Sequence, residues 1–208
     1  MNRKTIGIVL FDDVEVLDFC GPFEVFSVAR VDESHRREDA SPFEVLLVAE
    51  NAGPVRTSGN MQVLPHVSFD DCPQLDIIVV PGGWGTRIEI DNQIMLSFVR
   101  CQAKRAALVT SVCTGSLVLG KAGLLDGLRA TTHWQALDLM TELLPTVEVD
   151  RGRHVVEDGS VLTSAGISAG IDLALRVVAR ECGEGVARAT ARYMEYPYPD
   201  SDDRRIHL

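Results

Sequence analysis

The sequence predicts an α/β fold, a flavodoxin-like doubly wound and mostly parallel sheet with helices on both faces. Short continuous apolar runs such as IGIVLF and DIIVV are typical of parallel strands that are buried on both faces. These runs alternate with helical segments, as right-handed crossovers in such a sheet require. The chain has 208 residues, of which 46% are hydrophobic and 24% are charged. This size and composition are typical of a single globular domain, which we place at 1–208.

The predicted elements follow one another along the whole chain. Strands are predicted at residues 6–11, 43–49, 76–80, 106–111, 128–133, 147–150 and 161–164. Helices are predicted at residues 17–29, 93–103, 116–122, 134–144, 169–182 and 186–194. Residues 32–41 are rich in charge and are predicted to be a solvated loop. Residues 55–63, with Gly59 and Asn60 near their centre, predict a hairpin.

The charge balance and the apolar runs exclude several classes of partner. With 20 Lys and Arg against 30 Asp and Glu, the net charge is −10. Binding to nucleic acid or to anionic lipid needs clustered Lys and Arg, so neither partner is expected. Every apolar stretch is shorter than the roughly 20 residues that cross a bilayer. The N-terminus has no small-residue cleavage site, so we predict a cytoplasmic protein rather than a secreted one.

Five cysteines are spread widely along the chain, at Cys20, Cys72, Cys101, Cys113 and Cys182. Their number is odd and no CxxC pair occurs, so free thiols are expected rather than disulfides or metal ligands. Neither GxGxxG nor GxxxxGK[ST] is present, so the sequence predicts no nucleotide-binding loop. We therefore predict no metal and no cofactor.

Cys113 is the strongest candidate for a catalytic residue. It lies between the predicted strand 106–111 and the predicted helix 116–122. A strand, a sharp turn with a nucleophile and a helix form the nucleophile elbow that exposes a reactive side chain above a sheet. The N-terminus of the following helix is expected to favour the thiolate. The alternative is that Cys113 is a small buried residue in a tight loop.

Two glycines follow the predicted strand 76–80. The backbone N–H groups of Gly82 and Gly83, together with that of Thr114, form a candidate oxyanion hole, because glycine leaves no side chain in the way. An ordinary glycine-rich turn is the alternative. Trp84 comes directly afterwards and is a candidate for a substrate-binding wall, whereas Arg87 is expected to be a solvated loop residue.

Asp18 lies just beyond the first predicted strand, within the apolar segment LDFCGPFEVF. A carboxylate is costly to bury without a partner, so Asp18 is a candidate acid facing the cysteine. Two alternatives stay open: Asp18 caps the helix, or Glu15 is the acid instead. The carboxyl ends of parallel strands meet at one edge of a doubly wound sheet, where Asp18, the glycines and Cys113 are expected to converge. His133 is expected to be structural, as a cap of the following helix.

Four segments together resemble the DJ-1/PfpI superfamily, also known as ThiJ/PfpI or class I glutamine amidotransferase-like proteins. They are IGIVLFDDVEVLDFCGPFEVF (6–26), LDIIVVPGG (75–83), TSVCTGSLVLGKAGLLDGLRATTHW (110–134) and LTSAGISAGIDLAL (162–175). The resemblance implies a flavodoxin-like sandwich with Cys113 as nucleophile, and usually a homodimer. PfpI-like peptidases carry His after the nucleophile, whereas this chain has Thr114, so a protease would lack its base.

Within that superfamily, the chain is most similar to two groups. The segments LDFxGPxEVF, VCTGSLVLGKAGLL and RATTHW resemble the isocyanide hydratases and the N-terminal domain of AraC-family regulators. The regulators continue with helix-turn-helix motifs, while EYPYP (195–199) near the end of this chain resembles the hydratases. Cys20, beside the candidate acid, departs from the hydratase pattern.

The resemblance implies hydration of an isocyanide, a small-molecule substrate, to an N-substituted formamide. Cys113 would form a covalent thioimidate and Asp18 would move the proton. The Thr114 hydroxyl would hold water, and the N–H groups of Gly83 and Thr114 would stabilise developing charge. A glyoxalase or deglycase with the same nucleophile is one alternative. A non-enzymatic sensor with an oxidisable Cys113 is the other.

Overall fold

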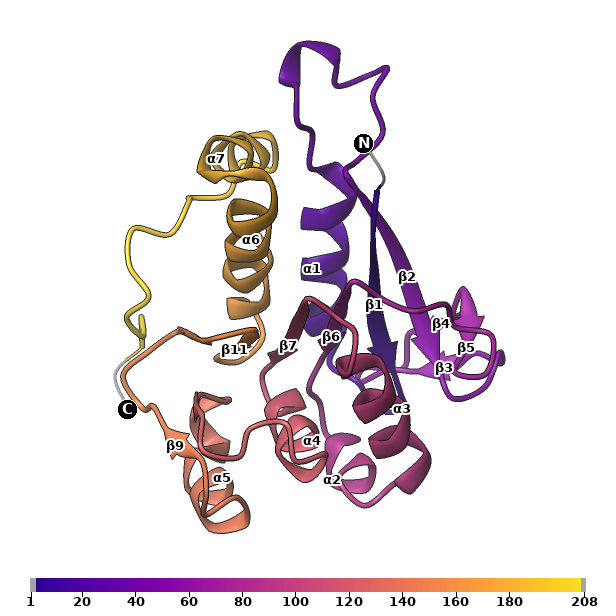
Figure 1. Cartoon of the computed structure of the whole chain (residues 1–208), viewed down its shortest axis with the longest axis vertical. Coiled ribbons are helices and arrows are strands. Elements are labelled where there is room, and N and C mark those ends of the chain that lie inside the picture. Colours follow the sequence, from indigo (N-terminus) through magenta and orange to yellow (C-terminus); the bar gives the residue numbers. More distant parts are fainter. Residues whose placement is uncertain (1–2, 207–208) are drawn as a thin grey trace.

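Residues 3–206 are described by a computed structural model, and its centre is a seven-stranded sheet (Figure 1). The strand order is β10-β11-β7-β6-β1-β2-β5. All neighbouring strands are parallel except β10, which is antiparallel to β11 at one edge. The predicted doubly wound, mostly parallel sheet is therefore confirmed.

The elements of the main sheet and the helices have the following bounds. The strands are β1 Lys4–Leu10, β2 Phe43–Ala49, β5 Val67–Ser68, β6 Ile77–Val80, β7 Leu108–Val112, β10 Val155–Asp158 and β11 Val161–Ser164. The α-helices are α1 Val16–Val28, α2 Thr86–Glu89, α3 Gln93–Ala103, α4 Gly115–Lys121, α5 Leu137–Leu143, α6 Ala169–Cys182 and α7 Glu184–Tyr193. Two short 3-10 helices are η1 Glu33–His35 and η2 Trp134–Ala136.

The helices pack in two groups. Helix α6 contacts both α1 and α7, and α4 contacts both α2 and α3 (Figure 1). Between them, the central strands β1 and β6 are buried along almost their whole length, as the apolar sequences TIGIVL and IIVV require. No helix within residues 3–206 is long and apolar enough to span a membrane.

The order of the strands fixes where a ligand can bind. From β1 the chain moves to β2 on one side, and it later returns to β6 on the other side of β1. Such a reversal opens a crevice at the carboxyl ends of the two strands. The loops that leave β1, β6 and the next strand, β7, therefore form the candidate site.

The structure corrects several predicted boundaries. The predicted strands 128–133 and 147–150 shrink to β8 Arg129–Ala130 and β9 Glu148–Val149, which pair with each other outside the main sheet. The predicted hairpin is present as β3 Val55–Arg56 and β4 Gln62–Val63. Sequence patterns missed β5, β10 and α2, because each is only two to four residues long and shows too little periodicity.

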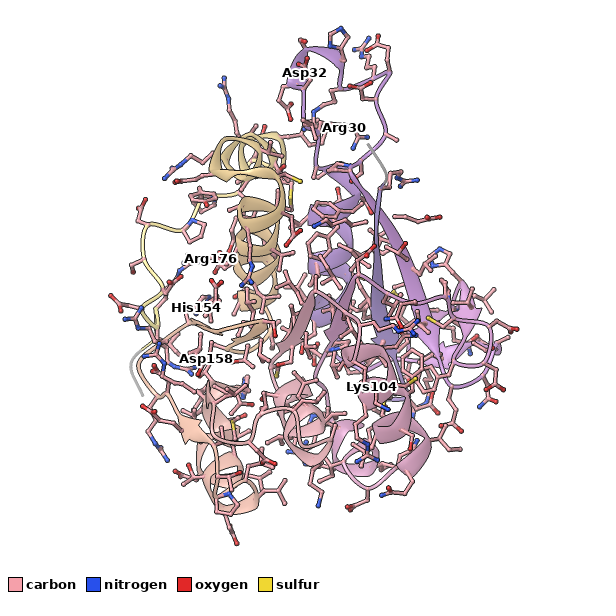
Figure 2. All side chains as sticks on the ribbon, in the orientation of Figure 1. Arg30, Asp32, Lys104, His154, Asp158 and Arg176 are labelled. Atoms are coloured by element: carbon pink, nitrogen blue, oxygen red, sulfur yellow. The ribbon has the colours of Figure 1, made fainter. Side chains whose placement is uncertain are left out.

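The last residues of the described chain run back along the outside of α6 and β10. The side chain of Asp172, buried on α6, accepts a hydrogen bond from the Tyr196 hydroxyl at 3.0 Å and is paired with His154 and Arg205. In Figure 2 the labelled His154 and Arg176 lie beside this tail, and Arg176 is paired with Asp202. A buried carboxylate with several partners fixes the tail against the body of the protein.

Candidate active site

Cys113 lies on the turn between β7 and α4, where its backbone is left-handed with φ of 55°. Its N–H points at the carbonyl oxygens of Ser164 and Ala165, at 3.2 and 3.1 Å. Its own carbonyl accepts hydrogen bonds from the hydroxyls of Thr132 (3.0 Å) and Ser116 (3.1 Å). A non-glycine residue keeps this conformation only when its surroundings enforce it. These contacts therefore hold the thiol in one place at the end of β7.

Asp18 lies in the first turn of α1 and is completely buried. Its Oδ2 atom accepts a hydrogen bond from the Gly82 N–H at 2.9 Å, and its Oδ1 atom has no partner among the described residues. Burial raises the pKa of Asp18 to about 7, and the nearby charge of Glu15 adds to this rise. Glu15, not Asp18, occupies the N-cap position, so the helix-cap alternative for Asp18 is wrong.

The thiol of Cys113 and the carboxyl group of Asp18 influence each other. Burial raises the pKa of Cys113, and the Asp18 carboxylate raises it further. The backbone and the side chain of Thr114 act in the opposite direction. Burial therefore opposes the thiolate that the N-terminus of the short helix α4 is expected to favour.

The two glycines bring the loop after β6 into close contact with the cysteine turn. A Cβ atom on Gly82 would lie 2.5 Å from the Thr114 nitrogen and 2.8 Å from the Cys113 Cβ. The Gly82 N–H is used by Asp18, and the Gly83 N–H donates to Thr114 Oγ1 at 3.1 Å. Neither N–H is free to stabilise a substrate oxygen, which corrects the predicted oxyanion role of Gly82 and Gly83.

The hydroxyl of Thr114 also has its hydrogen bonds within the protein. Thr114 Oγ1 accepts from the Gly83 N–H, lies 3.0 Å from Thr86 Oγ1 and donates to the Gly83 carbonyl at 3.3 Å. This arrangement corrects the expectation that the hydroxyl would hold a water molecule. Thr114 instead ties the loop after β6 to the turn that carries Cys113.

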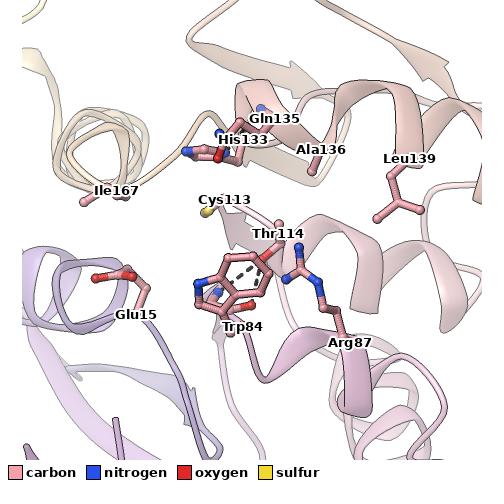
Figure 3. A pocket seen from close by; sticks show the side chains of 11 residues that line it. Glu15, Trp84, Arg87, Cys113, Thr114, His133, Gln135, Ala136, Leu139 and Ile167 are labelled. Atoms are coloured by element: carbon pink, nitrogen blue, oxygen red, sulfur yellow. Dashed lines mark hydrogen bonds between the residues drawn. The ribbon is translucent and has the colours of Figure 1, made fainter. Parts of the chain in front are cut away.

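A cavity of about 190 Å³ opens over Cys113 (Figure 3). Its lining is formed by Glu15, Gly83, Trp84, Arg87, Cys113, Thr114, His133, Gln135, Ala136, Leu139 and Ile167. Cavities that hold drug-sized ligands have about 300 to 1,000 Å³, so this one fits a small molecule. Asp18 does not line this cavity but lies behind its lining, whereas Glu15 is one of the lining residues. The two candidate acids are therefore in different positions relative to the cavity.

Sequence reasoning did not place Gln135, Ala136, Leu139 or three further residues in this pocket. His133 caps η2 as predicted, because its Nδ1 accepts the Gln135 N–H at 3.3 Å, but its ring also lines the cavity. Arg87 is exposed and also lines the cavity, instead of being only a loop residue. Ile167, whose backbone is left-handed with φ of 57°, also lines the cavity. No local sequence pattern marks these three, since tertiary contacts alone bring them to Cys113. Cys20 does not line the cavity.

Fold and site together define a class: an α/β sandwich with a buried cysteine on the turn after a central strand and a buried carboxyl group beside it. Residues 4–180 match the DJ-1/PfpI family. The chain belongs to this family, as the sequence resemblance predicted.

Known proteins that resemble this chain include both an enzyme and a regulator. The isonitrile hydratase of Pseudomonas putida is 42% identical over 198 residues, which are 95% of this chain and 81% of that protein. The HTH-type transcriptional regulator GbdR of Pseudomonas aeruginosa is 27% identical over all of this chain, which spans 55% of the regulator. A crystal structure of a ThiJ/PfpI family protein from Pseudomonas syringae superimposes with a TM-score of 0.84 and 30% identity, covering 97% of this chain and 79% of that one.

Proposed function

We propose that this protein hydrates an isocyanide to the N-substituted formamide, with Cys113 as the nucleophile. The observation that carries this proposal is the buried Cys113–Asp18 pair, of which Cys113 lines a small cavity and Asp18 lies behind it. The similarity to an isonitrile hydratase supports the choice of substrate class.

In the first half of the reaction, the sulfur and the proton of the Cys113 thiol both add to the terminal carbon of the isocyanide. The Asp18 carboxylate takes the thiol proton, and the sulfur attacks the terminal carbon of the isocyanide to form the C–S bond. Asp18 then returns the proton to that same carbon, which gives the thioimidate R–N=CH–S–Cys113. A carboxyl group with a pKa of about 7 is suited to both steps, because it accepts and releases a proton near neutral pH.

The second half of the reaction releases the product. Water adds to the thioimidate carbon while its proton passes through Asp18 to nitrogen, giving R–NH–CH(OH)–S–Cys113. The C–S bond then breaks, the thiol regains its proton and R–NH–CHO leaves. Of the three predicted donors, the Thr114 N–H is the one directed at the Cys113 sulfur, where it lowers the pKa of the thiol, so we assign stabilisation of the developing charge to it.

A homodimer is also part of this proposal. The resemblance to the family implies it, and large apolar side chains are exposed around the cavity, at Trp84, Ile88 and Trp134. Exposed apolar side chains of this size are candidates for the contact surface between two copies of the chain. Sedimentation equilibrium measures the mass directly, and a mass of one chain at micromolar concentration would contradict the dimer.

A steady-state assay with an aryl isocyanide tests the function. We expect the wild-type protein to produce formamide, and Cys113→Ala and Asp18→Ala to lose most of this activity. Cys101→Ala, which changes an exposed thiol on α3, is the matched control and should stay active. Conversion of methylglyoxal without any turnover of isocyanide would favour the glyoxalase alternative. No turnover of either would favour a sensor.

A further inference from the structure

The guanidinium group of Arg87 lies at the rim of the cavity over Cys113, on the short helix α2 (Figure 3). Within residues 3–206 it makes no hydrogen bond and has no carboxylate within 4.0 Å. By contrast, Arg36, Arg56 and Arg180 are paired with carboxylates. In a chain with a net charge of −10, Arg87 thus provides a positive charge beside the reactive cysteine that no neighbour neutralises.

The indole ring of Trp84 supports this guanidinium from one face. The centre of the guanidinium lies 3.9 Å from the ring centroid. Stacking on an aromatic face leaves the in-plane N–H donors of an arginine free, and these donors match the two oxygens of a carboxylate. The stack also reduces the number of conformations that the arginine samples before a ligand binds.

The backbone beneath Arg87 is fixed relative to Cys113. The neighbouring Thr86 is completely buried, and its hydroxyl lies 2.7 Å from the Gly83 carbonyl and 3.0 Å from Thr114 Oγ1. Thr114 directly follows Cys113 in the chain. The loop that carries Arg87 and the turn that carries the thiol are therefore one hydrogen-bonded unit, which sets their separation.

The opposite wall of the cavity decides which way a charged substrate lies. Glu15 lines that wall, and Figure 3 shows Cys113 between Glu15 on one side and Arg87 on the other. An anionic group is repelled by Glu15 and attracted by Arg87. The side chains of Ala136 and Leu139 add apolar surface to the lining, which suits a short carbon chain.

We infer that Arg87, stacked on Trp84, forms an anion subsite and that the substrate is a small isocyanide carrying a carboxylate at its other end. The identity of the reacting group rests on the proposed function, whereas the anion subsite rests on the geometry of Arg87 alone. The substrate would place its isocyanide carbon at Cys113 and its carboxylate on the guanidinium.

Turnover provides the first test. We compare kcat/KM for 3-isocyanopropanoate with that for isopentyl isocyanide, which has the same shape without the charge. The wild-type protein should prefer the carboxylate, and Arg87→Gln should reduce the ratio of the two values roughly ten- to hundredfold, since hydrogen bonds to charged groups contribute this much. Arg192→Gln, which removes the same charge from an exposed position on α7, should leave the ratio unchanged.

Alkylation provides a second test that does not depend on isocyanide chemistry. Iodoacetate and iodoacetamide have similar shape, but only the first carries a carboxylate. Relative to N-acetylcysteine, Cys113 should react preferentially with iodoacetate in the wild-type protein and in Arg192→Gln, and should lose this preference in Arg87→Gln. Mass spectrometry of the Cys113 peptide separates this reaction from that of the other four thiols.

The two tests distinguish the two proposals. A preference for iodoacetate that depends on Arg87, without isocyanide turnover, would support the anion subsite and overturn the substrate's reacting group. Turnover of isocyanides with equal ratios in the wild-type protein and Arg87→Gln would support hydration and overturn the subsite. Equal changes in Arg87→Gln and Arg192→Gln would also overturn the subsite, because only overall charge would then matter.

Discussion

Asp18 and Gly82, which are 64 residues apart in the chain, are joined by a hydrogen bond of 2.9 Å from the Gly82 N–H to the Asp18 carboxylate. This contact connects the first helix with the loop that packs against the Cys113 turn. It gives the buried carboxyl group one fixed partner, and the second carboxyl oxygen has no hydrogen bond within residues 3–206. A fixed carboxyl group with one free oxygen is well suited to move a proton to and from a neighbouring thiol.

Asp18→Asn should retain the structure but lose proton transfer. The amide oxygen still accepts the Gly82 N–H, whereas the side chain no longer takes up a proton. We expect turnover to fall by about 10²- to 10⁴-fold, which is the usual contribution of general acid–base catalysis. Steady-state kinetics measure this loss, and a thermal melt checks the fold. Turnover within a fewfold of the wild-type value would contradict the role of Asp18.

The raised pKa of Asp18 should also affect stability. Its carboxyl group has an ordinary pKa of 3.8 when the chain is unfolded and a pKa of about 7 in the folded protein. Below pH 3.8 the carboxyl group is protonated in both the folded and the unfolded state, so it does not lower the free energy of unfolding. As the pH rises from about 4 to about 7, the unfolded state has released this proton while the folded state still holds it, so the free energy of unfolding falls by up to about 4 kcal/mol, and the loss is complete above pH 7.

Urea unfolding at several pH values checks this linkage. Between pH 4 and pH 8, the wild-type protein should lose stability relative to Asp18→Asn, which does not titrate. Parallel stability curves for the two proteins over this range would show that Asp18 has an ordinary pKa.

Glu15→Gln should shift the pH dependence of the reactive thiol. Alkylation of Cys113 should increase as the pH rises through about 7, because the ionised Asp18 then accepts the thiol proton. The negative charge of Glu15 is one cause of the raised pKa of Asp18, so its removal should move the midpoint to lower pH. Glu24→Gln, on the exposed side of α1, is the control. A midpoint that moves equally in both variants would contradict the prediction.

Gly82→Ala should damage both the fold and the site. The added Cβ would lie 2.5 Å from the Thr114 nitrogen, so the cysteine turn or the β6 loop must move. We expect a loss of about 1–3 kcal/mol, typical of overpacking, together with most of the activity. Gly185→Ala, in α7 with no atom within 4 Å of the new Cβ, should instead stabilise the protein by up to about 1 kcal/mol. Urea midpoints compare the two, and equal effects would be inconsistent with this argument.

Arg204→Met should weaken the strand end next to His133. The Arg204 guanidinium donates to Thr131 Oγ1 at 2.9 Å and to the Thr132 carbonyl at 3.2 Å, and the Thr132 hydroxyl in turn donates to the Cys113 carbonyl. We expect a loss of about 1–3 kcal/mol and a changed rate of Cys113 alkylation. Arg153→Met, whose side chain is exposed, should change neither quantity.

Much of the fold could be predicted from the sequence, because strands that are buried on both faces are continuous runs of apolar residues. Continuous apolar runs predicted β1, β6 and β7, and residues 93–103 matched α3. The position of Cys113 between a strand and a helix was also visible locally. Short elements such as α2 and β10 could not be predicted, because four residues are too few to show the periodic spacing of apolar side chains.

The sequence by itself determined the fold class, the family and the location of Cys113, all of which depend on neighbouring residues in the chain. Only the tertiary structure decided that the Gly82 N–H serves Asp18, that the Thr114 hydroxyl ties two loops together, and that Glu15 and Arg87 face the cavity. The physical reason is that hydrogen bonds and pocket walls join groups distant in sequence. Which donor meets which acceptor depends on how the elements pack, because each buried polar group takes the partner that packing brings within reach.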